Sequence, residues 1–381
     1  MLDAELFSTL DAHLAAQKQE GKRVAAYLAH ELVPVPLLEA AGVVPLPLIF
    51  AGTEELTHEG TVHLSPTTCV FARSIVGAFE PSNRTGKWKF LDHVDALLCL
   101  NYCNAENVAV ETICRVHGLK RFDFFLPNST LGKSLKLAHE RLVRLRRELE
   151  EWTGREVRDE EVWRAINRQY EAKRVLGEVL RSDLPGSDKL ELFQRAALMG
   201  ARWVLESPQL SAFRDGTPRN AGNGRGKGRR VVLSGCSFFM GDPLADVVEE
   251  AGFDVAVDDT WLGTRYLSDA VQPGDGGDPL VRLLDAYAKD GSIHFAPNAL
   301  STTVGHVASL VRELGVKGVL HHQIKFCDLF PFVQDRYRPA LQGTGASVLW
   351  IERDYAAKQS AQLLTRLEAF GEILEEGGGE L

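Results

Sequence analysis

Short apolar segments alternate with helix-like segments along most of this chain, and this alternation is the feature that most limits its fold. The apolar runs are short and bounded by helix-like segments, so each predicts a strand. Strands that alternate with helices are typical of α/β proteins, in which helices cover a sheet. The clearest runs are VAAYLAH, DALLCL, VVLSGC, DVAVDD, SIHFAP, GVLHHQI and SVLWIE. The fold class is therefore predicted to be α/β.

The alternation is interrupted once, in the middle of the chain. From residue 131 onward the pattern is helical and charged, and residues 215–230 have the glycine-rich composition of an exposed connection. Strand candidates then resume. We therefore predict an N-terminal α/β domain with a leading helix at 1–130, a helical segment and linker at 131–228, and a C-terminal α/β domain with a terminal helix at 229–381. Both α/β domains are expected to be Rossmann- or flavodoxin-like.

Charge and hydropathy restrict the partners of the protein. The net charge is −9 and the lysines are not clustered, which argues against nucleic acid or an anionic membrane surface as a partner. The N-terminal segment has early acidic residues and no apolar core of a signal peptide. The longest apolar stretch, AAGVVPLPLIFAG, is too short to cross a bilayer and contains two prolines. A cytoplasmic protein that binds a small molecule or another protein is expected.

Three cysteines occupy one kind of position in this pattern. Cys69, Cys103 and Cys327 each lie where an apolar, strand-like run is expected to stop and a helix to begin. In α/β proteins, sites are built at this edge of the sheet. In a reducing compartment, cysteines are more often buried thiols or metal ligands than disulfides. The three thiols are therefore candidates to converge on one soft metal centre that keeps a fourth coordination position open.

The other three cysteines differ in their surroundings. Cys99 lies within an apolar run and Cys114 on an expected helix with apolar neighbours, so both are predicted to be core residues. Cys236 ends the run VVLSGC, the same kind of position as the three leading cysteines. It stays open whether Cys236 is a ligand or a thiol near the site. Structural zinc is disfavoured, because the chain contains no CxxC knuckle.

Two glycine-containing segments invite a nucleotide interpretation and do not support it. GNGRGKG precedes a strand candidate instead of following one, so it cannot place phosphates at a helix start in the Rossmann manner. LPNSTLGKS ends like a Walker A loop, but Pro127 occupies the place of its first glycine and removes an amide donor. ATP is therefore expected to bind elsewhere.

At the cysteines and around them, the chain resembles the 2-hydroxyacyl-CoA dehydratase family, which includes benzoyl-CoA reductase subunits and double-cubane cluster proteins. The resemblance covers nearly the whole length and is carried by ELVPVPLLEAAGVVPLPL, CVFARSIVG, DALLCLNYCN, VVLSGC, EEAGFDVAVDDTWLGTRY, GVLHHQIKFCD and LLTRLEAF. It implies that Cys69, Cys103 and Cys327 bind a [4Fe-4S] cluster between the two α/β domains, with one iron open.

The resemblance also implies the chemistry and the partners. In such enzymes the cluster passes one electron to the thioester carbonyl of a 2-hydroxyacyl-CoA. The resulting ketyl radical anion expels its hydroxyl group, assisted by an iron that acts as a Lewis acid. An ATP-dependent iron-sulfur activator protein supplies the electron, and members usually work as two unlike subunits. The expected function is therefore that of a subunit of a radical-type lyase, or of an acyl-CoA-reducing oxidoreductase. The partner is a homologous second subunit or a second copy of this chain.

Several features leave alternatives open. Double-cubane relatives use six cysteines of one chain for an [8Fe-9S] cofactor and reduce small molecules, and this chain also has six. Asn104 stands where an aspartate is expected after the cysteine. A non-catalytic electron-transfer subunit is a third interpretation, in which the aromatic segments SFFMGD and TWLGTRY are only core.

Two pairs of polar residues are further candidates. His30 and Glu31, after a strand candidate, are candidate proton-transfer groups, although Glu31 alternatively only starts the next helix. Thr365 and Arg366 match the terminal helix motif of the family, where a cation is placed to meet a CoA phosphate or the partner subunit. A buried structural ion pair is the alternative role for Arg366.

Overall fold

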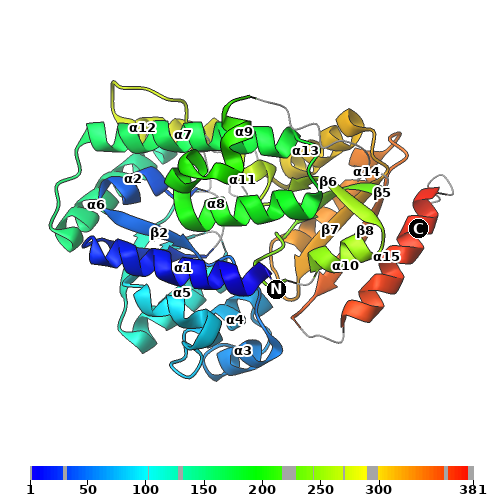
Figure 1. Ribbon diagram of the computed structural model, residues 1–381, viewed down its shortest axis with the longest axis horizontal. Coiled ribbons are helices and arrows are strands. Elements are labelled where there is room, and N and C mark those ends of the chain that lie inside the picture. Colours follow the sequence, from blue (N-terminus) through cyan, green and yellow to red (C-terminus); the bar gives the residue numbers. More distant parts are fainter. Residues whose placement is uncertain are drawn as a thin grey trace.

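The computed structural model contains two parallel four-stranded sheets that are covered by helices (Figure 1). It describes residues 2–28, 32–101, 103–127, 132–216, 229–242, 244–268, 271–289, 299–355 and 359–375. The prediction of two Rossmann-like α/β units is confirmed by this architecture. The predicted strand at SIHFAP, most of the predicted linker, and the candidates His30 and Glu31 lie outside the described residues.

The first sheet has the strand order β2-β1-β3-β4. Its strands are β1 (Arg23–Tyr27), β2 (Val43–Pro47), β3 (Ala96–Leu100) and β4 (Lys120–Phe124). The chain starts in the middle, moves outward to β2, and returns to the other side of β1 to form β3. The strand order therefore reverses between β1 and β3, where a crevice opens beyond the carboxyl ends of these strands.

Both faces of this sheet are covered, which explains why β1, β2 and β3 are almost continuously apolar, whereas the edge strand β4 has alternating exposed and buried positions. One face packs against α1 (Leu2–Gln19), α4 (Val70–Ala78) and α5 (Asn104–His117). The other packs against α2 (Val35–Ala40), α6 (Gly132–Thr153), α7 (Asp159–Arg181) and α12 (Pro279–Lys289). Helix α6 and the first half of α7 therefore complete the core of the N-terminal sheet, whereas the second half of α7 packs with residues 193–213 in an apolar cluster of their own.

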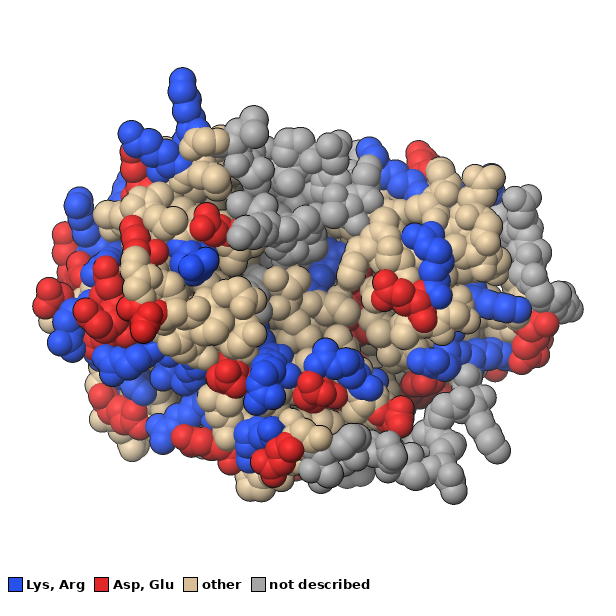
Figure 2. Space-filling view, turned by 90° about the horizontal axis from the view of Figure 1, so that it is seen from above, with Lys and Arg blue, Asp and Glu red and all other residues tan. Residues whose placement is uncertain are grey.

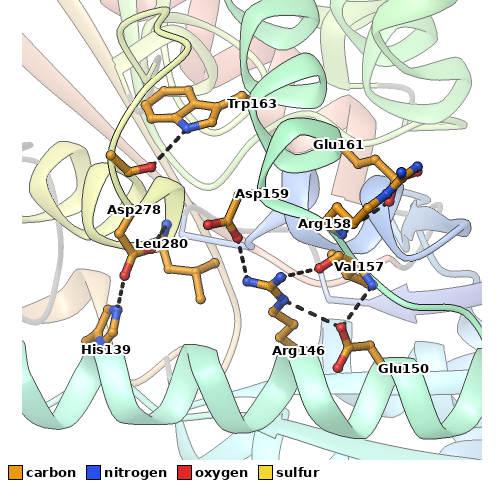
Figure 3. Close-up of polar contacts among 11 residues, drawn as sticks. His139, Arg146, Glu150, Val157, Arg158, Asp159, Glu161, Trp163, Asp278 and Leu280 are labelled. Atoms are coloured by element: carbon orange, nitrogen blue, oxygen red, sulfur yellow. Dashed lines mark hydrogen bonds and ion pairs between the residues drawn. The ribbon is translucent and has the colours of Figure 1, made fainter.

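Polar contacts fix the helices of this second face to one another (Figure 3). Arg146 on α6 bonds to Asp159 at the start of α7, with 2.7 Å between Nη1 and Oδ1. His139 on α6 lies 2.7 Å from the Asp278 carboxylate, just before α12. The Trp163 indole of α7 donates to the Gly277 carbonyl over 3.2 Å. These contacts stabilise the packing of three helices whose facing sides are otherwise apolar.

The second sheet repeats the same topology with the strand order β6-β5-β7-β8. Its strands are β5 (Arg229–Gly235), β6 (Phe253–Asp259), β7 (Gly318–Ile324) and β8 (Ser347–Arg353). Helices α10 (Leu244–Glu250) and α15 (Gln359–Glu375) cover one face, and α13 (Ala299–Leu314) and α14 (Gln334–Leu341) cover the other. Here the strand order reverses between β5 and β7.

The two α/β units are joined through a shared core. Residues of the second unit, among them Cys236, Phe239 and Ile324, belong to the same apolar cluster as α1 and α4 of the first. A short parallel bridge pairs Phe50 with Met240 across the boundary. The units therefore meet at a packed interface. Helix α8 (Gly186–Glu206) runs beside this junction and contacts both β2 and β6.

The remaining described elements are short. They are helices α3 (Glu54–Glu59), α9 (Ser211–Arg214) and α11 (Thr264–Ser268), and the single-turn or irregular 3-10 helices η1 (Gly60–Val62), η2 (Gly86–His93), η3 (Pro208–Leu210) and η4 (Phe330–Val333). Among the described helices, none combines the length and the apolar composition that a bilayer crossing needs. On the face in Figure 2, basic and acidic side chains are interspersed and form no single extended basic area.

Candidate functional site: four cysteines at the domain junction

Three cysteines follow strands that flank the two points of strand reversal. Cys103 comes shortly after β3 in the first sheet, and Cys236 and Cys327 come shortly after β5 and β7 in the second. In open α/β sheets these crevices, beyond the carboxyl ends of the strands, are where ligands bind. The duplicated topology thus directs thiols from both sheets toward the junction.

Cys69 reaches the junction by a different route, and its expected position at a strand end is wrong. Between β2 and Cys69 the chain forms α3 and η1, and residues 63–69 form no strand. The segment before Cys69 is polar and contains Pro66, which lacks an amide donor for a strand ladder. Cys69 instead occupies the N-cap of helix α4.

Each of the three leading cysteines has its sulfur at the start of a helix, where backbone amides lack helical partners. The Cys103 sulfur, at the N-cap of α5, accepts from the Glu106 amide over 3.4 Å. The backbone amides of Phe71 and Ala72, in the first turn of α4, favour the thiolate of Cys69, although burial outweighs them and raises its pKa. The backbone amides of Leu329 and Phe330, at the start of η4, help to lower the pKa of Cys327. Such amides stabilise a thiolate and therefore suit metal ligation.

Hydrogen bonds across the junction place Cys69 beside Cys327. The Val70 amide, directly after Cys69, donates to the Lys325 carbonyl over 3.2 Å. Burial, followed by the charge of Cys327, raises the pKa of Cys69 to about 12. Burial likewise raises the pKa of Cys103, and the charges of Cys69 and Cys327 contribute to this rise. The three sulfurs therefore lie close enough to influence one another electrostatically.

Cys236 joins this group as its most buried member. It is 5% exposed, and its amide donates to the His322 carbonyl over 2.8 Å. Its side chain hydrogen-bonds to that of Cys327 and lowers the Cys327 pKa to about 7, while burial raises the pKa of Cys236 itself. The physical picture is a Cys236 thiol that donates to a Cys327 thiolate.

Cys99 and Cys114 lie apart from the four, as core residues of the first unit. The Cys99 thiol donates to the Asn107 side chain over 3.0 Å, and that of Cys114 is directed to the Lys120 carbonyl at 3.8 Å. Cys99 is fully buried and Cys114 is 7% exposed. The prediction that both are core residues is confirmed.

This arrangement differs from a site for one metal ion. Within the described part of the chain, no three His, Cys, Asp or Glu side chains are grouped tightly enough to hold a single ion. In an iron-sulfur cluster each thiolate binds a different iron, so the ligand sulfurs lie farther apart than the ligands of one ion. Separate thiols with amide donors, brought together from two domains, fit a polynuclear cluster better than a structural zinc.

The terminal-helix candidates do not join the cysteines. Thr365 and Arg366 are both exposed on α15, which packs on β8 and α10. The Arg366 guanidinium donates to the Trp350 carbonyl, in the middle of β8, over 2.5 Å. A buried ion pair at Arg366, one of the expected roles, is therefore wrong, because the side chain is exposed and bonds to a backbone carbonyl.

Aromatic residues connect the cysteine group with a cavity between the domains. Phe71, two residues after Cys69, stacks on Phe239 at 4.7 Å, and Phe239 stacks on Trp261 at 6.2 Å. Trp261 lines a cavity of about 90 Å³, which also has walls from β1, β2, α7 and α11. Phe239 of SFFMGD and Trp261 of TWLGTRY thus link the segment after Cys69 to this cavity through stacked rings.

Two residues near the site carried no signal in the sequence. Arg353, at the end of β8, forms a buried ion pair with Asp242 after Cys236. Tyr355, two residues further, inserts into the first unit. A tyrosine and an arginine after an apolar run are common in proteins and predict no particular role. Their role becomes visible only in the structure, where both residues contact segments that are distant in the sequence.

Comparison with known proteins shows the family of this chain. A family model described as 2-hydroxyglutaryl-CoA dehydratase, D-component, matches residues 32–374. The (R)-2-hydroxyglutaryl-CoA dehydratase subunit beta of Acidaminococcus fermentans is 22% identical over 370 residues, which cover 95% of each chain. The putative dehydratase subunit YjiM of Escherichia coli is 23% identical over 364 residues, which cover 90% of this chain and 89% of the relative. The chain belongs to the family of the 2-hydroxyglutaryl-CoA dehydratase D-component.

Proposed function

We propose that this protein is the iron-sulfur subunit of a 2-hydroxyacyl-CoA dehydratase, in which Cys69, Cys103 and Cys327 hold a [4Fe-4S] cluster. The observation that supports this proposal most directly is that these three cysteines lie at the domain junction, each at the start of a helix whose backbone amides favour a thiolate. Both relatives are named as dehydratase subunits, one of them as putative, which supports the reaction class.

When bound, such a cluster supplies single-electron transfer and, at an iron without a protein ligand, a Lewis acid for the substrate hydroxyl group. The protein contributes the environment of the cysteine sulfurs. Helix-start amides stabilise the negative charge of the thiolates. The cysteines are half-buried, and the rings of Phe71 and Phe239 pack in the same core and keep most water away from the sulfurs. Exclusion of water protects a reactive intermediate from side reactions.

The cavity between the domains is our candidate for the acyl part of the thioester substrate. It receives Tyr27 and Pro45 from the first sheet, Gln169 and Lys173 from α7, and Trp261 and Arg265 from the second unit. Apolar walls with a few polar groups are typical of small-molecule sites. The stacked rings of Phe71, Phe239 and Trp261 link this cavity to the segment that follows Cys69, which supports its assignment to the substrate.

Two protein partners complete the proposal. The relative from Acidaminococcus fermentans is named as subunit beta, which supports a second subunit for this chain. We further propose that a separate ATP-dependent iron-sulfur protein supplies the low-potential electron, since neither glycine-containing segment of this chain has the features of a phosphate-binding loop.

Cys236 favours a second candidate function, that of a subunit that stores or relays electrons. A fourth thiol beside Cys327 would close the coordination of the cluster and leave no iron open for a substrate. The double-cubane alternative receives less support, because Cys99 and Cys114 are bonded elsewhere in the first core. The two functions differ in whether Cys236 is a ligand.

Analysis of iron and acid-labile sulfide in anaerobically purified protein tests the proposal. About four irons and four sulfides per chain are expected for one cubane. Cys69→Ser, Cys103→Ser and Cys327→Ser are each expected to lose most of this iron, whereas Cys114→Ser is a matched control that retains it. Cys236→Ser retains the iron if the site is open and loses it if Cys236 is a ligand. Zinc without sulfide in the wild type would contradict the cluster.

A further inference from the structure

Tyr355 extends from the C-terminal unit into the N-terminal one. It lies two residues beyond β8, and its ring packs against the apolar core that contains α1 and α4. A Cβ placed at Gly52 would lie only 2.7 Å from Cδ2 of Tyr355 and 2.3 Å from Cβ of Ser74. Ser74 belongs to α4, the helix that begins after Cys69. The tyrosine ring is therefore held in a tight slot beside that helix, and only glycine leaves room for it at position 52.

Two backbone hydrogen bonds connect this slot with the cysteines. The Lys325 amide, two residues before Cys327, donates to the Arg353 carbonyl over 2.7 Å. The Lys325 carbonyl in turn accepts from the Val70 amide next to Cys69. The strand end that carries Tyr355 is thus fixed to both cysteine-bearing segments. The phenol also experiences the charges of Cys69 and Cys236, which add to the rise of its pKa by burial.

The Tyr355 hydroxyl is buried and has no hydrogen-bond partner among the residues that the structure describes. Leaving a buried hydroxyl unpaired is unfavourable, and native proteins nearly always satisfy such groups. Phenylalanine would fill the same slot without this cost. Tyr337 shows the usual solution, because its buried hydroxyl lies 2.7 Å from Ser234 Oγ. An unpaired hydroxyl on a strand end that is bonded to both cysteine-bearing segments, and that experiences the charges of Cys69 and Cys236, indicates a partner that arrives with the bound group.

We propose that the Tyr355 hydroxyl donates a hydrogen bond to a sulfur of the iron-sulfur group held by the cysteines, and that this bond stabilises the reduced form. The inference rests on the proposed function, because it requires that group. Reduction adds negative charge to the sulfurs, so a donor bonded to them favours the reduced state and raises the reduction potential. Tyr355 is then a positioning and tuning residue that does not touch the substrate.

Tyr355→Phe removes only the hydroxyl and tests the proposal with two measurements. In the iron-loaded protein, a redox titration followed by electron paramagnetic resonance is expected to give a more negative midpoint potential than in the wild type. In the metal-free protein, thermal unfolding is expected to give an equal or higher melting temperature, since the hydroxyl has no partner there. A merely structural hydroxyl would change the second measurement and leave the first unchanged.

Tyr337→Phe is the matched control. Its hydroxyl is already bonded to Ser234, so this variant is expected to lower the melting temperature of the metal-free protein and to leave the potential unchanged. An unshifted potential in iron-loaded Tyr355→Phe, or a lowered melting temperature in its metal-free form, overturns the proposed role of Tyr355. Neither result overturns the proposed function. Wild-type protein that takes up neither iron nor sulfide overturns the proposed function and the role of Tyr355 with it.

Discussion

The side chains of Cys236 and Cys327 share a hydrogen bond at the ends of two neighbouring strands, β5 and β7. This pair lies at the strand reversal of the second sheet, and Cys103 follows the corresponding reversal of the first. The duplicated topology therefore explains why thiols that are far apart in the sequence meet. It also explains why Cys236 belongs to the group although its environment is more buried.

The hydrogen bond predicts how Cys327 reacts in metal-free protein. Because the Cys236 thiol donates to it, Cys327 has a pKa of about 7, and its alkylation rate is expected to rise through neutral pH. Cys236→Ala removes the donor, so the pKa of Cys327 is expected to rise and its alkylation at pH 7 to slow. Iodoacetamide labelling at several pH values, followed by peptide mass spectrometry, measures this change.

Cys236→Ser is the control for that experiment. A serine hydroxyl can still donate to the Cys327 sulfur, so its labelling profile is expected to stay closer to that of the wild type than to that of Cys236→Ala. If both variants label Cys327 with the wild-type pH dependence, the hydrogen bond does not set its pKa.

Gly235, directly before Cys236, is predicted to be essential for the shape of the site. Its φ is +92°, and a Cβ there would lie 2.1 Å from the His322 carbonyl oxygen. Gly235→Ala is expected to cost about 3 kcal/mol or more of unfolding free energy, because strain and backbone overlap combine. Gly241 has a φ of +80°, but a Cβ there would have no atom within 4 Å. Gly241→Ala is therefore expected to cost only about 1 kcal/mol of unfolding free energy. Urea unfolding measures both, and equal losses would argue against the overlap.

The sequence predicts the fold well because its signal is local. A parallel sheet covered on both faces requires short apolar strands, and these are visible as runs such as VVLSGC and GVLHHQI. The order of the strands within each sheet is not visible, because it depends on long-range pairing. The middle helices illustrate the same limit, since α6 and α7 are apparent from their periodicity but their packing on the first sheet is not.

Part of the candidate site could be predicted from the direction in which the strands run. Cys103 and Cys327 follow apolar runs, and their convergence follows from parallel strands that end at one edge. Cys69 shows where this reasoning fails, because it reaches the site at the start of α4 without a preceding strand. Tyr355 and Arg353 were out of reach, since their importance depends on how the two units pack together.

The ion pair between Arg353 and Asp242 is predicted to hold the end of β8 against the loop after Cys236. The side chain of Arg353 is 8% exposed and that of Asp242 is 1% exposed. Arg353→Met leaves a buried carboxylate without its cation and is expected to lower the unfolding free energy by about 3–5 kcal/mol. Adding Asp242→Asn removes that charge and keeps an oxygen for the Leu244 amide, so part of the loss is expected to be recovered. Additive losses in the double variant, measured by urea unfolding, would contradict direct coupling.

His321 predicts a loss of stability in mild acid. Its side chain is 1% exposed against Trp350, and burial lowers its pKa from 6.5 to about 3. Between these values the unfolded chain binds a proton that the folded protein excludes, so stability falls as the pH falls through this range. From pH 6 to pH 5, the wild type is expected to lose about 1 kcal/mol more than His321→Gln, which cannot titrate.

Urea unfolding of both proteins at pH 7, 6 and 5 measures this difference, and the comparison cancels the groups that they share. The same experiment with His322→Gln separates the two neighbours. His322 also has its pKa lowered by burial, but its Nδ1–H donates to the Cys236 carbonyl over 2.9 Å. His322→Gln is therefore expected to lose stability already at pH 7, whereas the loss in His321→Gln at that pH is expected to be smaller. Parallel pH profiles for the wild type and His321→Gln would show that the folded protein accepts the proton, contrary to the burial of the ring.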